Sequence, residues 1–91
     1  MREHLKNIIV ALKELGGEAR PKDIVSKVAE YEGIAEISRN YTEDIWANVE
    51  KHCSDYKTYE GSTDLFKKVP LEKNHVKWAL RNPDIDIDNL E

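Results

Sequence analysis

Residues 64–81, DLFKKVPLEKNHVKWALR, carry the pattern that decides the fold. In VKWALR (76–81), apolar side chains alternate with other residues, which is typical of a strand with one buried face. We expect Val76, Trp78 and Leu80 on that face and Lys77, Ala79 and Arg81 on the other. Leu65, Phe66 and Val69 predict a preceding strand that ends at Pro70, so residues 71–75 form the turn of a β-hairpin.

Three helices are predicted before this hairpin. Residues 3–15 have apolar side chains at helical spacing (Leu5, Ile8, Ile9, Leu12 and Leu15), followed by Gly16-Gly17. A second helix begins at Pro21, which suits a first helical turn, and ends before Gly33. A polar connector covers 33–41, and a third helix runs from a Thr42 N-cap to about His52, with Ile45 and Val49 facing inward.

This order of elements predicts an α+β fold, a winged helix-turn-helix over residues 1–81. An unrelated small α+β domain with the same order of elements is the alternative. Residues 82–91 are predicted to form an acidic, flexible tail.

Composition limits the class of protein. The 91 residues suit one small domain, and no apolar run approaches the 18 residues of a membrane span. With Cys53 as the single cysteine, no internal disulfide can form, so we expect a reducing, cytoplasmic compartment. One cysteine and three scattered histidines do not give zinc-ligand spacing, and no catalytic motif stands out. We therefore expect no metal, no cofactor and no enzymatic activity.

The charge is unevenly distributed along the chain. The net charge is −4, but the last ten residues alone contribute −4. Residues 1–50 carry seven basic and ten acidic residues, whereas residues 51–81 carry seven basic and four acidic ones, a net charge of +3. Since a local field matters more to a polyanion than the total charge, the second half is the expected surface for nucleic acid.

The stretch IWANVEKHCSDYKTYEGSTDLFKKV (45–69), followed by VKWALR, resembles the winged-helix domain appended to several prokaryotic restriction endonucleases. The matching features are the basic-His pair at 51–52, the Cys-Ser-Asp at 53–55, Asp-Leu-Phe at 64–66 and the final Trp-Ala-Leu-Arg. The resemblance implies DNA binding and, as in some members, sensing of adenine methylation, as the recognition part of a restriction-modification or regulatory system. Two residues depart from the family, Trp46 at an often basic position and Glu50, which lowers the positive charge.

Candidate DNA contacts lie in three places. The second helix of a helix-turn-helix pair enters the major groove, where Asn can pair with adenine, and hydroxyl and ammonium groups suit phosphate oxygens. The candidates are Trp46, Asn48 and Lys51 on the third helix, Ser54, Asp55, Tyr56, Lys57 and Tyr59 in the following loop, and Lys73 and Lys77 at the hairpin turn.

Structural roles compete for several of these residues. Trp46 is either outward, for a base or a partner protein, or packed inward. The alternatives are an ordinary solvated helix face for Asn48, a cap at the helix end for Ser54 and Asp55, and packing under the hairpin for Tyr59.

Two functions follow from these observations. The expected partner is double-stranded DNA, with a nuclease or another protein as a possible second partner and no membrane. The alternative is a protein–protein interaction module on the same fold, because fold does not fix function.

Overall fold

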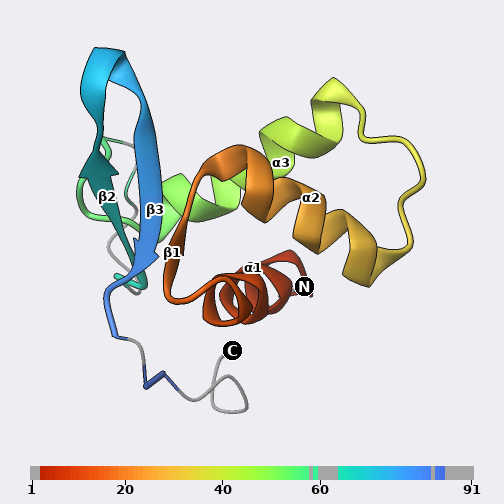
Figure 1. Ribbon diagram of the computed structural model, residues 1–91, viewed down its shortest axis with the longest axis horizontal. Coiled ribbons are helices and arrows are strands. Elements are labelled where there is room, and N and C mark those ends of the chain that lie inside the picture. Colours follow the sequence, from red (N-terminus) through yellow and green to blue (C-terminus); the bar gives the residue numbers. More distant parts are fainter. Residues whose placement is uncertain (1–2, 58, 60–63, 83, 86–91) are drawn as a thin grey trace.

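Three helices come before most of a small antiparallel sheet, which gives an α+β fold (Figure 1). The computed structural model describes residues 3–57, 59, 64–82 and 84–85, with the side chains of residues 3 and 74 excepted. The elements are α1 (Glu3–Glu14), β1 (Glu18–Ala19), α2 (Pro21–Glu32), α3 (Arg39–Lys51), β2 (Phe66–Pro70), the 3₁₀ turn η1 (Glu72–Asn74) and β3 (Val76–Leu80). The predicted flexibility of 82–91 concerns residues that lie mostly outside the described part.

The sheet has the strand order β1-β3-β2, with both pairings antiparallel. The hairpin is confirmed, and Pro70 closes β2 on an edge strand, where its missing N–H is tolerated. Strand β1 lies between α1 and α2, where the sequence pattern predicts no strand, and Ala19 pairs with Trp78 of β3. Two residues are too few to show a period of two, so the pairing could not be predicted from the pattern.

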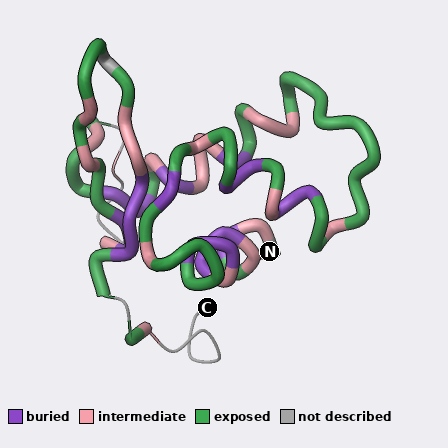
Figure 2. Tube along the Cα trace, viewed as in Figure 1, coloured by how far each residue is buried: buried purple, intermediate pink, exposed green. Residues whose placement is uncertain are grey.

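The apolar faces of the helices meet at one core that includes Trp78 and Phe66 of the sheet. Figure 2 shows the buried stretches gathered where the helices and the base of the hairpin meet, whereas the hairpin turn and the connector between α2 and α3 are exposed. Leu15 does not belong to this core, because α1 ends at Glu14 and the Leu15 side chain is 37% exposed.

Helix α3 begins earlier than predicted. Its N-cap is Ser38 rather than Thr42, and the Ser38 side chain accepts a hydrogen bond from the Tyr41 amide at 3.0 Å. Thr42 lies in the first turn and donates its hydroxyl to the Ser38 carbonyl. The prediction was wrong because Ser and Thr are both good caps. Only Ser38 has the extended backbone of an N-cap, whereas Thr42 lies within the helix.

The burial of successive side chains along β3 alternates less regularly than the apolar pattern of its sequence predicts. Trp78 and Leu80 are buried as predicted, but Ala79, expected on the polar face, is also only 3% exposed. It pairs with Glu18 on one side and Lys67 on the other, and a methyl group between two longer side chains on a central strand is covered by them.

A polar cluster joins the helices at the carboxyl end of α2. The Glu32 carboxylate accepts hydrogen bonds from the Tyr41 hydroxyl at 2.7 Å and from the Asn7 amide at 2.8 Å, and it lies 2.8 Å from His4 Nδ1. Burial raises the pKa of Glu32, but these partners outweigh it, so the pKa lies below the ordinary value of 4.5. This single carboxylate therefore ties α2 to both α1 and α3.

Candidate nucleic-acid interface

Helix α3 turns Ile45 and Val49 into the core, as predicted. Trp46, on the flank of this buried face, is only partly buried. Its ring packs edge-on against Trp78, with centroids 4.7 Å apart and an interplanar angle of 77°. The placement of Trp46 is thus intermediate between the outward and the inward one, because one side of the ring packs on the core and another lines surface pockets.

The remaining side chains of α3 give no positive surface. Asn48 is half-buried and its amide donates to the Asp44 carbonyl at 2.9 Å, within the helix. Lys51 is exposed at the carboxyl end of the helix. Arg39 pairs with Glu43 at 3.2 Å, and with Asp44 and Glu50 the charged side chains of α3 sum to −1.

The loop after α3 is tied to the sheet by its own polar side chains. The Asp55 carboxylate accepts from the Lys68 amide at 2.9 Å and from the Arg81 guanidinium at 3.3 Å. Ser54 donates both its amide and its hydroxyl to Asp64, at 3.0 and 2.7 Å. Burial raises the pKa of Asp64, but Ser54 and Arg81 together hold it below the ordinary value. Ser54 and Asp55 therefore fix the loop rather than extend from it.

Tyr56 is held in the same way. Its hydroxyl accepts a hydrogen bond from Trp78 Nε1 at 2.9 Å, and Lys68 Nζ lies 4.9 Å from its ring centroid. Trp46 and Tyr56 are thus brought together through Trp78. Lys57 is exposed beyond this anchor, and Tyr59 is half-buried.

The two candidate lysines of the hairpin differ in their ion pairing. Lys73 is exposed at the turn, where its φ of 58° places it in the left-handed region. Lys77 forms an ion pair with Glu18 of β1 at 3.4 Å. Because Glu18 neutralises part of its charge, Lys77 offers less to a polyanion than Lys73 does.

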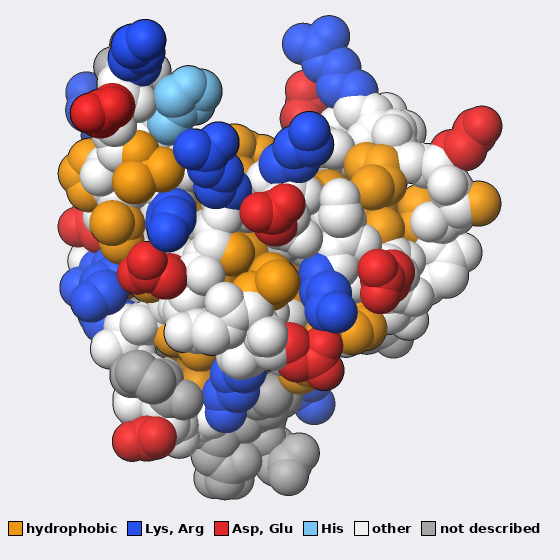
Figure 3. Space-filling view, viewed as in Figure 1, with side chains coloured by type: hydrophobic (Ala, Val, Ile, Leu, Met, Phe, Trp, Pro, Cys, Tyr) orange, Lys and Arg blue, Asp and Glu red, His pale blue; other side chains and the backbone are white. Residues whose placement is uncertain are grey.

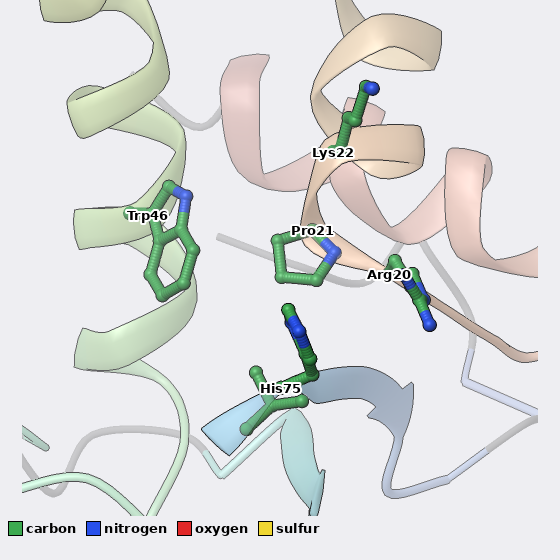
Figure 4. Close-up of a pocket in the computed structure, with 6 residues that line it drawn as sticks. Arg20, Pro21, Lys22, Trp46 and His75 are labelled. Atoms are coloured by element: carbon green, nitrogen blue, oxygen red, sulfur yellow. The ribbon is translucent and has the colours of Figure 1, made fainter. Parts of the chain in front are cut away.

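A groove opens between the start of α2, the flank of α3 and the start of β3. We call it the hairpin groove; it has a volume of about 360 Å³ and is lined by Arg20, Pro21, Lys22, Trp46, His75 and Val76. Figure 4 shows Trp46 and Pro21 on opposite sides of it, with His75 below them. A neighbouring hollow continues it to the hairpin turn and is lined by Arg20, Leu71, Glu72, Lys73 and His75.

Basic side chains surround this groove. Figure 3 shows Lys and Arg side chains along the upper edge of the molecule, from the hairpin turn across the helices, with acidic and apolar side chains between them. Arg20 and Lys22 are exposed, like Lys73. Of the residues that the structure describes, none forms a salt bridge with these three.

Sequence reasoning missed Arg20, Lys22 and His75. The sum over residues 1–50 is negative and hides two cations only two positions apart, at the beginning of a helix. The available signal was Arg-Pro-Lys, because the predicted start of a helix at Pro21 places both cations at one end of it. Their approach to the hairpin turn depends on the pairing of β1 with β3.

No family model, curated protein or solved structure matches this chain. Within the described ranges, no group of three or more His, Cys, Asp or Glu residues is arranged to hold a metal ion. No helix in the same ranges has both the length and the apolar character that a bilayer span requires.

Proposed function

We propose that the chain is a winged-helix DNA-binding module, with α2 and α3 as the helix-turn-helix pair and the β2–β3 hairpin as the wing. The order of elements and the β1-β3-β2 sheet support this arrangement. The observation that carries the proposal is the set of three exposed cations, Arg20 and Lys22 on the hairpin groove and Lys73 on the hollow that continues it, without a salt bridge among the described residues. Lys and Arg in this state suit phosphate oxygens.

This geometry shifts the expected interface toward the wing. The start of α2 and the hairpin turn provide the phosphate contacts, and α3 contributes through Trp46 more than through its charged side chains, which sum to −1. Lys51 and Lys57 remain candidates at the edge of the interface, because both are exposed. Ser54, Asp55 and Tyr56 position the loop, since their polar atoms already bond to the protein.

Two matched double variants test the proposal. Arg20→Glu with Lys22→Glu and Lys51→Glu with Lys57→Glu change the net charge equally, but only the first pair lies on the hairpin groove. We expect the first to weaken binding of a labelled duplex at low salt by about 100-fold or more, because lost phosphate contacts become repulsive, and the second to weaken it by less than about tenfold. Fluorescence anisotropy measures both, with circular dichroism as the control for folding.

The same titration at several salt concentrations counts the contacts. Each neutralised phosphate contributes about 0.9 to the slope of log K against log salt, so three contacts predict a slope near −2.7. Equal affinity of wild type and the Arg20 and Lys22 double variant would contradict the proposal.

Matched adenine-methylated and unmethylated duplexes in this assay test the methylation sensing that the family resemblance implies, and any cleavage would require another chain or segment.

A protein–protein interaction module is the second candidate, and one observation favours it. A second pocket of about 370 Å³ lies between α2 and α3, with Val25, Ile37 and Trp46 among its lining residues, and the Ile37 side chain is 43% exposed. A photo-crosslinking residue at Ile37 should then give one discrete protein adduct in cells, and the same residue at the neighbouring exposed Glu36 should give much less. Absence of duplex binding by wild type together with this adduct would favour the second function.

A further inference from the structure

The hairpin groove differs from an ordinary phosphate-binding surface in its walls. Trp46, Pro21 and Val76 give it apolar sides, and His75 adds a second flat ring (Figure 4). The edge-on contact with Trp78 fixes the Trp46 ring, and Trp78 is itself fully buried and hydrogen-bonded to Tyr56. A phosphate needs none of these walls, so they indicate a flat, apolar group as the ligand.

The cations lie at the edge of the groove, not inside it. Figure 4 shows the Arg20 and Lys22 side chains extending away from the Trp46 and Pro21 rings. Lys73 and His75 line the hollow that continues the groove toward the hairpin turn. The site therefore combines an apolar interior with an edge on which Arg20, Lys22 and Lys73 outnumber the one lining carboxylate, Glu72, and this arrangement is complementary to a nucleobase whose flanking phosphates remain outside.

We infer that the hairpin groove binds one unpaired nucleobase, at a mismatch, a damaged position or a single-stranded segment of DNA. This inference rests on the proposed DNA binding and specifies its substrate class. Stacking on an aromatic ring favours the bound base, whereas removal of a base from an intact duplex opposes it. The protein should therefore discriminate between DNA in which one base is already unpaired and fully paired DNA of the same sequence.

The experiment compares two duplexes that differ at one position. One contains 2-aminopurine opposite an abasic site, and the other contains it in a normal pair with thymine. We expect wild type to bind the first about tenfold more tightly, and 2-aminopurine fluorescence to change on saturation of the first only. Trp46→Ala should abolish the preference for the abasic duplex, whereas Trp46→Phe, which keeps a ring, should retain most of it.

Loss of the Trp46 contact with Trp78 can destabilise the fold, so a second readout is needed. The emission of Trp46, obtained as the difference between wild type and Trp46→Phe, should be quenched by the abasic duplex. Equal affinity for the two duplexes with unchanged Trp46 emission overturns the inference but leaves DNA binding intact. Absence of binding to either duplex overturns both proposals, and quenching by an acidic peptide but by neither DNA identifies the groove as a peptide site.

Discussion

The two ends of helix α2 use charge in opposite ways. At the carboxyl end, the Glu32 carboxylate lies within hydrogen-bonding distance of Tyr41, Asn7 and His4. At the amino end, Arg20 and Lys22 are exposed, and no described residue forms a salt bridge with them. Charges with internal partners hold the helices together, whereas charges without them are available to a ligand. The comparison therefore separates residues that hold the fold together from those that we propose to bind DNA.

The largest effect on stability is expected at the carboxyl end of α2. Glu32→Gln should lower the free energy of unfolding by about 2 kcal/mol at neutral pH, because an amide cannot replace a carboxylate that accepts from three partners. Glu36→Gln, the same change at an exposed position of the connector, should have almost no effect. Urea unfolding of both variants measures the difference.

The pH dependence of this effect has a defined sign. Because the folded-state pKa of Glu32 is lowered, its stabilisation is complete above the ordinary value of 4.5 and is lost as the pH falls through the folded-state pKa. The gap between wild type and Glu32→Gln should therefore narrow below about pH 4.5. A gap that stays constant down to pH 3 would show that the carboxylate does not hold the helices through its charge.

The bounds of α2 could be predicted from the sequence, but the partners of Glu32 and the lining of the hairpin groove could not. Pro21 and Gly33 gave the two ends of α2 correctly. The partners of Glu32 come from positions 25 and 28 residues away and from the next helix, and periodicity carries no such information. Likewise, the groove depends on contacts among α2, α3 and the hairpin, so only Trp46 of its lining could be selected beforehand.

A smaller effect is expected at the amino end, and it should have opposite signs for stability and binding. Asp23 lies exposed in the first turn of α2, next to Lys22, where a negative charge stabilises the helix but repels DNA. Asp23→Asn should lower the free energy of unfolding by about 0.5 kcal/mol and strengthen duplex binding about two- to threefold. Unfolding and anisotropy measurements on one preparation test both signs. Glu36→Gln is again the control, and weaker binding by Asp23→Asn would place the DNA elsewhere.

The smallest effect is expected at a pair that lies near the carboxyl end but remains exposed. The Tyr31 hydroxyl donates to Glu14 at 2.5 Å, and burial together with this contact raises the pKa of Tyr31 to about 12. Solvent screens the pair because the Tyr31 side chain is 37% exposed, so Tyr31→Phe should lower the melting temperature by less than about 2 °C.

The sign of its pH dependence is the reverse of that of Glu32. A raised folded-state pKa means that the contribution of Tyr31 is complete below pH 10 and is lost as the pH rises from 10 toward about 12. Thermal melts of wild type and Tyr31→Phe should therefore converge over that range. If Tyr31→Phe instead lowers the stability as much as Glu32→Gln does, the contribution of a carboxylate would not depend on how many helices it joins or on how far it is buried. The presence of a hydrogen-bond partner alone would then account for the stabilisation at the carboxyl end of α2.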